Sequence, residues 1–188
     1  MYLKISRVLD IAERFFVLNG FDGLYTMMGI IVGSYVAGHH DPNIVLASGF
    51  TGIVALGISG SASAYVSEKA MREKQIKKLE RHMMKKMDKT VQKEASDFAA
   101  VFSALVNGFS PILTAMIMVI PFILARIGLL GVEYAFSYSM MIGAFEVIVV
   151  GFYLGKISGG SKIAYGMRML FIAAVAVIIS YYLGYMLS

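Results

Sequence analysis

The sequence predicts an all-α integral membrane protein with five transmembrane helices. Hydrophobic residues make up 58% of the 188 residues and charged residues only 15%, whereas a soluble domain is closer to half apolar and a quarter charged. Five charge-poor stretches are long enough to cross a bilayer. The chain has no cysteine, which excludes disulfides and thiolate metal sites.

The distribution of basic residues predicts the orientation of the spans. Three Lys or Arg lie in the N-terminal segment, ten in residues 67–97 and three before the last span, whereas the opposite loops hold only Arg126. Basic residues concentrate in cytoplasmic segments of membrane proteins. We therefore expect a multi-pass protein of the cell membrane with its N-terminus in the cytoplasm and its C-terminus outside. The net charge of +5 follows from this topology, so we expect no nucleic-acid partner.

Residues 1–18 are predicted to form an amphipathic N-terminal helix, because apolar side chains share one face and charges lie elsewhere. It either lies at the inner interface or forms the wet end of the first span. Residues 19–66 hold spans one and two, from about Phe21 to Gly38 and from about Ile44 to Val66. Span one carries Asp22 at its mouth. The carboxylate either meets a partner, an ion or a water path, or it caps a helix in the headgroup layer.

Small residues predict close helix packing in both spans. Gly29 and Gly33 form a GxxxG ridge in span one, and Gly57 and Gly60 lie in a half of span two that is almost entirely Gly, Ala and Ser. Such residues allow helix backbones to approach each other in membranes. A cavity lined by the same residues is the less common outcome.

Residues 67–97 change character to ten basic and six acidic residues. Apolar residues recur at three- and four-residue steps, which predicts one amphipathic helix of about 25–30 residues that extends span two into the cytoplasm. Some of its side chains could form a metal-collecting surface: Glu73, Glu80, His82, Met83 and Met84. Ordinary helix packing explains the methionines, and solvation the charges, at least as well.

Residues 98–188 hold spans three to five. Span three, about 98–124, contains Pro111 and Pro121, which either only kink the helix or expose backbone carbonyls to an ion. Its Asn107-Gly108-Phe109 repeats Asn19-Gly20-Phe21 of span one. Span four, about 134–154, carries Glu146 deep in an apolar run, and span five covers about 169–187.

The two carboxylates inside apolar spans, Asp22 and Glu146, are the candidate metal ligands. Oxygen ligands suit Mn²⁺ and Fe²⁺, and the nearby thioethers of Met27 and Met28 would add softness. No catalytic motif is present in a fitting context, so we expect neither an enzyme nor a prosthetic group.

The sequence resembles the vacuolar iron transporter family. Three stretches carry the resemblance: Asp22-Gly23-Leu24 with Thr26 and Gly33, Tyr65-Val66-Ser67 after the small-residue half-helix, and Arg168, Ala176, Tyr182 and Gly184 in the last span. The resemblance implies a homodimer with its ion path between subunits, exchange of Fe²⁺ or Mn²⁺ for protons, and Asp22 as an ion ligand. Two ligands of the family are replaced here, a Met by Gly60 and a Glu by Ala64.

Two functions follow from this pattern. The first is a divalent metal transporter that exports Fe²⁺ or Mn²⁺ from the cytoplasm by proton exchange. The second, favoured by the missing ligands, is a non-transporting membrane scaffold or sensor whose basic cytoplasmic helix binds lipid or a partner.

Overall fold

The computed structural model describes residues 2–84 and 91–187, and the side chains of residues 12–82, 84 and 94–187. It contains five α-helices in this part of the chain. In chain order they are α1 (Tyr2–Val36), α2 (Pro42–Met83), α3 (Val91–Arg126), α4 (Val132–Ile157) and α5 (Lys162–Leu187). All five are long and apolar enough to cross a membrane, which confirms the predicted all-α class and number of spans.

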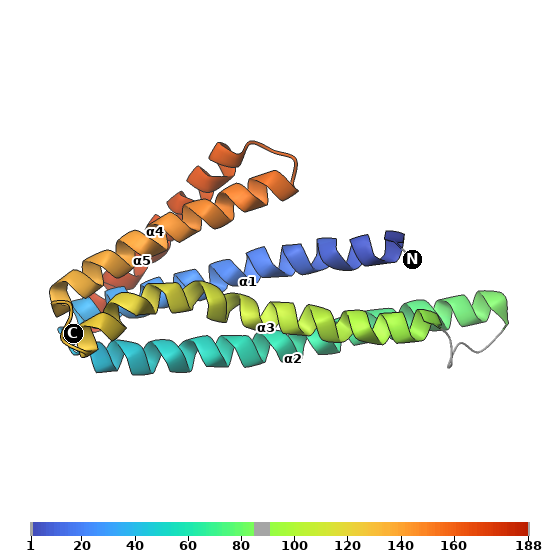
Figure 1. Cartoon of the computed structure of the whole chain (residues 1–188), viewed down its shortest axis with the longest axis horizontal. Helices are drawn as coiled ribbons and strands as arrows, with labels where there is room; N and C mark the ends of the chain where they lie inside the picture. Colours follow the sequence, from blue (N-terminus) through green and yellow to red (C-terminus); the bar gives the residue numbers. More distant parts are fainter. Residues whose placement is uncertain (1, 85–90, 188) are drawn as a thin grey trace.

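The helices alternate in direction (Figure 1). The N-terminus, the end of α2 with the start of α3, and the turn between α4 and α5 therefore lie toward one end of the molecule, which we call the basic end after its Lys and Arg residues. The two short turns and the C-terminus lie at the opposite end. The side of the membrane that each end faces stays a prediction from the basic residues.

Standard helix caps fix the α1–α2 turn. Gly38 has a positive φ of 74°, which ends α1, and the Asp41 carboxylate accepts a hydrogen bond of 2.8 Å from the Asn43 amide at the start of α2. Pro42 occupies the first position of α2, where its missing N–H has no helical partner to lose. Asp41 therefore has a structural role at the opposite end.

Helices α1, α2 and α3 pack side by side, and α4 with α5 forms a hairpin that diverges from α1 toward the basic end (Figure 1). Helix α3 contacts α1, α2 and α4. The α4–α5 contact depends on glycines, because a Cβ at Gly151 would lie 2.8 Å from the Gly166 Cα. The apolar core contains residues of all five helices, and Leu24, Met118 and Phe122 are fully buried in it.

Two predicted boundaries differ in outcome. Residues 1–18 form the first part of α1, which runs without a break from Tyr2 to Val36 and whose membrane-length stretch begins at Ala12, in agreement with the alternative that they continue into the first span. Residues 67–97 do not form one helix: α2 ends at Met83, Met84 adopts a left-handed conformation with φ of 48°, and α3 begins at Val91. A left-handed residue stops the helical hydrogen-bond series.

Helix α3 continues through Pro111 and Pro121, and it bends in its second half (Figure 1). Proline removes one backbone hydrogen bond and bends a helix. The prolines therefore leave α3 a bent but unbroken rod, and its neighbours contact its polar and proline-bearing face.

Candidate ion site

Asp22 lies near the middle of the membrane-length part of α1. It is ten residues after Ala12 and fourteen before Val36. At 1.5 Å per residue, the ten residues from Ala12 place Asp22 about 15 Å from the start of the stretch. This stretch begins nine residues before Phe21, the predicted start of span one, and the position of Asp22 relative to the membrane stays a prediction. The Asp22 side chain is exposed in the single chain.

The α1 turn that carries Asp22 is held by side chains of α3. The Thr114 hydroxyl donates to the Gly20 carbonyl at 2.9 Å, and the Ser110 hydroxyl donates to the Phe16 carbonyl. Both hydroxyls are buried. Because the two carbonyls belong to successive turns of α1, these bonds fix the rotation of α1 about its own axis.

The two asparagines of the repeated Asn-Gly-Phe sequence meet at this contact. Asn19 donates from its side-chain amide to the Asn107 side-chain carbonyl, and Asn107 donates to the Gly60 carbonyl of α2 at 2.8 Å. Asn107 therefore links α1, α2 and α3 at one point. We call Asn19, Asn107, Ser110 and Thr114 the polar clamp.

Close backbone approach reinforces the polar clamp. A Cβ at Gly23, the residue after Asp22, would lie 2.7 Å from the Pro111 Cα, and a Cβ at Gly57 would lie 2.9 Å from the Gly108 carbonyl oxygen. Real Cβ atoms are not found so close to backbone. Gly23 therefore allows α1 to lie close against α3, while the adjacent Asp22 side chain is exposed.

Glu146 occupies the matching depth on α4. It lies eleven residues before Ile157 at the basic end of its span, against ten residues from Ala12 to Asp22. The side chain is half-buried, and its Oε2 is enclosed without a hydrogen-bond partner among the described residues. An enclosed carboxylate oxygen is stable only when it is protonated or bound to a donor or a cation, so Glu146 is a candidate ion ligand.

Contacts between helices support the common depth. The Tyr25 hydroxyl, one turn from the α1 carboxylate, donates to the Met169 carbonyl of α5 at 3.3 Å. Helices α4 and α5 are antiparallel with Gly151 against Gly166. Met169 is three residues after Gly166, so on the antiparallel α4 it lies opposite Ile148, which is three residues before Gly151. Ile148 is two positions from Glu146. The turns that carry the two carboxylates therefore lie at similar heights.

Met27 and Met28 do not join Asp22 within one chain. Both are buried. The Met27 sulfur lies 3.0 Å from the position of a Cβ at Gly49 of α2, and the Met28 methyl lies 2.7 Å from that at Gly143 of α4. Successive residues point about 100° apart on a helix of 3.6 residues per turn, so the two side chains leave α1 in different directions. In one chain both act as packing residues.

The suggested metal-collecting residues on α2 lie along its basic end. Glu73 and Glu80 are two helical turns apart, and the His82 ring donates a 2.7 Å hydrogen bond from Nδ1 to the Lys78 carbonyl. Met84 is exposed in the left-handed cap, whereas the Met83 side chain lies outside the described residues. Within the described ranges, no three His, Asp or Glu side chains are grouped as a metal site, here or in the spans.

Three of the four predicted packing glycines lie at contacts inside the chain. A Cβ at Gly29 would lie 3.4 Å from the Ser180 hydroxyl of α5, whereas a Cβ at Gly33 would meet nothing within 4 Å. Gly57 and Gly60 face α3, against Gly108 and Asn107. Gly29, Gly57 and Gly60 therefore lie at contacts between helices of one chain, and Gly33 has room for a side chain.

Sequence reasoning missed the polar clamp and a contact between α1 and α4. Three polar clamp residues, Asn107, Ser110 and Thr114, follow each other at three- and four-residue steps, as one face of a helix requires. That spacing was the available signal. The Glu13 side chain forms a hydrogen bond with the Tyr153 hydroxyl, and no sequence pattern indicates this pair.

The fold and these positions define a five-helix membrane protein with two carboxylates near the middle of its spans. Comparison with known families agrees: the profile of the VIT family matches residues 14–102 and 73–185, and the chain belongs to this family of vacuolar iron transporter proteins. Members of the family are transporters, not enzymes, so membership indicates metal-ion transport across a membrane.

One curated relative is similar over most of its length. It is the uncharacterized protein MJ0645 of Methanocaldococcus jannaschii, which is 26% identical over 160 residues, or 83% of this chain and 80% of the relative. No solved structure matches the chain.

Proposed function

We propose that the protein exports Fe²⁺ or Mn²⁺ from the cytoplasm in exchange for protons, with Asp22 and Glu146 as ion ligands. One observation carries the proposal: the two carboxylates lie at similar heights in two membrane-length helices. Neither forms an ion pair with any residue that the structure describes. Ionisable groups at this depth are costly and are typical of ion pathways.

The chemistry of the site favours hard to borderline divalent cations. Carboxylate oxygens suit Mn²⁺ and Fe²⁺, and Met27 and Met28 are occupied in packing. A metal ion binds only to the deprotonated carboxylate, so metal and protons compete for the same oxygens. This competition is the physical basis of exchange: a proton that arrives from outside releases the metal, and a departing proton frees the site for the next ion.

Two copies of the chain are proposed to complete the site. The Asp22 side chain is exposed in one chain, and a carboxylate facing lipid near the bilayer centre costs roughly 2.5–3.5 kcal/mol on insertion scales. A second copy packed on this face of α1 would remove the carboxylate from lipid and bring two Asp22 side chains together. The dimer would thus supply the ligands that one chain does not group.

The basic end is proposed to face the cytoplasm of a cell membrane, as the positions of Lys and Arg predict. Ions would then enter from the end where α4 and α5 diverge from α1, pass the two carboxylates and leave at the opposite end.

Uptake of Fe²⁺ and Mn²⁺ into proteoliposomes under an imposed pH gradient tests the function. The wild type is compared with Asp22→Asn, Glu146→Gln and Asp41→Asn. The Asp41 variant makes the same chemical change at the opposite end, where asparagine also caps a helix well. We expect gradient-dependent flux in the wild type and the Asp41 variant and almost none in the other two.

Two results would contradict the proposal. Flux that persists in Asp22→Asn would place the ion path elsewhere. An absence of flux for both metals from correctly folded wild-type protein would remove the transporter function for these ions and favour the scaffold or sensor with a lipid- or partner-binding basic end.

A further inference from the structure

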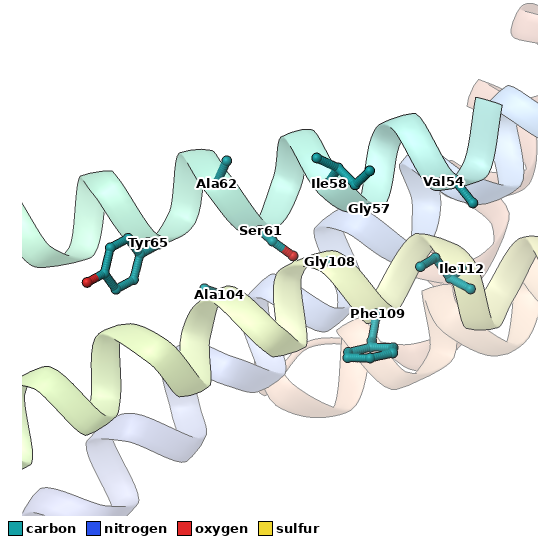
Figure 2. A pocket seen from close by; sticks show the side chains of 10 residues that line it. All are labelled: Val54, Gly57, Ile58, Ser61, Ala62, Tyr65, Ala104, Gly108, Phe109 and Ile112. Atoms are coloured by element: carbon teal, nitrogen blue, oxygen red, sulfur yellow. The ribbon is translucent and has the colours of Figure 1, made fainter. Parts of the chain in front are cut away.

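A shallow apolar groove runs along the outside of α2 and α3 (Figure 2). Its volume is about 490 Å³, and it extends along α2 from Val54 to Tyr65. Gly57, Ser61 and Gly108 allow the two helices to come close at its floor. The groove lies on α2 away from Gly49 and Gly52, which face α1. It is therefore separate from the exposed face that carries the ion-site carboxylate.

The length of the groove and its position along α2 match one leaflet of a bilayer. The distance from Val54 to Tyr65 is about 16 Å at 1.5 Å per residue, about half of the roughly 30 Å hydrocarbon thickness. No charged residue occurs in α2 before Glu68. Tyr65 is thus placed where tyrosines concentrate, at the membrane–water interface.

Charged groups of both signs lie next to the Tyr65 end of the groove. The Lys69 ammonium lies 3.2 Å from the Tyr65 hydroxyl and 5.4 Å from the centre of its ring. Lys69 also interacts electrostatically with Glu73 on α2 and with Asp97 on α3. The antiparallel contact of Gly57 with Gly108 agrees with this pairing, because Lys69 is twelve residues from Gly57 and Asp97 eleven from Gly108.

We propose that this groove binds a phospholipid with an ethanolamine headgroup from the leaflet at the basic end. An acyl chain lies in the apolar groove, the phosphate meets the Lys69 ammonium, and the primary ammonium of the headgroup meets the Asp97 or Glu73 carboxylate. An anionic headgroup would satisfy Lys69 but not the two carboxylates. A choline headgroup would carry the charge but has no N–H to donate to them.

Native mass spectrometry of the purified protein in detergent tests the site, with ethanolamine, choline and glycerol phospholipids of identical acyl chains as probes. The variants are Lys69→Gln and Asp97→Asn, with Lys74→Gln as the matched control. Lys74 is exposed on a different face of α2. All three variants change surface side chains, so they are expected to fold.

We expect the ethanolamine lipid to bind more tightly than the other two. Lys69→Gln should weaken its binding about fivefold, the factor that corresponds to about 1 kcal/mol per basic residue at a membrane surface. Asp97→Asn should remove the preference for ethanolamine over choline, and Lys74→Gln should change neither quantity.

Three outcomes would overturn the site. Equal effects of Lys69→Gln and Lys74→Gln would show general attraction of lipid to a basic surface. Equal binding of ethanolamine and choline lipids by the wild type would remove the role of the carboxylates. Complete disulfide dimerisation of an Ile58→Cys variant of this cysteine-free chain in membranes would show that a second copy covers the groove instead.

Discussion

The most apolar stretches of helices α3 and α5 have the same mean hydropathy but opposite surroundings. More than half of the most apolar stretch of α3 is buried, 56%, against 6% for α5. Helix α3 reaches α1 and α2 through the polar clamp, and it accepts a 2.6 Å hydrogen bond from Ser139 of α4 at the Met118 carbonyl. In α5 only Gly166 and Ala173 are buried.

The difference shows what positions a helix within a bilayer. Lipid is as apolar as a leucine side chain, so apolar burial alone gives no preferred neighbour. Hydrogen bonds and close backbone contacts do give a helix preferred neighbours. Helix α3 has both along its length and serves as the frame on which the Asp22 turn is held, whereas the surface of α5 is left to lipid or to another copy.

Gly23→Ala tests this account with the largest expected effect. The added methyl would meet the Pro111 backbone, which cannot yield as a side chain can. We expect a loss of more than about 3 kcal/mol of stability or no folded protein, at the upper end for overpacking. Gly33→Ala is the control, because a Cβ there meets nothing within 4 Å. Thermal unfolding in detergent measures both, and equal melting temperatures would refute the close α1–α3 contact.

Asn19→Ala and Asn107→Ala form a double-mutant cycle across the polar clamp. Interhelical hydrogen bonds in membranes average about 0.6 kcal/mol and reach about 1.7 kcal/mol. We expect Asn107→Ala to cost more than Asn19→Ala, because Asn107 also donates to α2. The coupling energy should fall in the same range. Additive effects in denaturant unfolding would mean that the two amides do not meet.

Thr114→Val removes one hydroxyl at nearly constant volume. It deletes the bond to the Gly20 carbonyl, so we expect a cost of about 0.6 kcal/mol and a reduced metal flux because the Asp22 turn is less firmly held. Thr51→Val on the exposed face of α2 is the matched control and should leave stability and flux unchanged. A variant of Thr114 with full stability but lost flux would assign this hydroxyl to ion binding instead.

Hydropathy and basic residues were sufficient to predict five helical spans, because both are properties of long stretches. The end of α2 was not predictable in this way, since the apolar spacing of residues 76–95 continues past the left-handed Met84. The repeated Asn-Gly-Phe was visible in the sequence, but the meeting of Asn19 with Asn107 depends on the parallel packing of α1 and α3.

The candidate ligands show the same limit. Asp22 and Glu146 were identified because charge in an apolar run is conspicuous. Met27 and Met28 were grouped with them through closeness in sequence, yet their side chains leave α1 toward α2 and α4. Which side of a helix meets which neighbour is decided by tertiary packing, so the direction of a side chain could not be predicted from its place in the sequence.

Equilibrium binding of Mn²⁺ to the protein in lipid nanodiscs, read from the electron paramagnetic resonance signal of free Mn²⁺, tests the central claim most directly. We expect Asp22→Asn and Glu146→Gln each to weaken binding at least about tenfold, a change of about 1.4 kcal/mol, and Asp41→Asn to leave it unchanged. Wild-type affinity in Asp22→Asn would contradict the claim that the α1 carboxylate is an ion ligand.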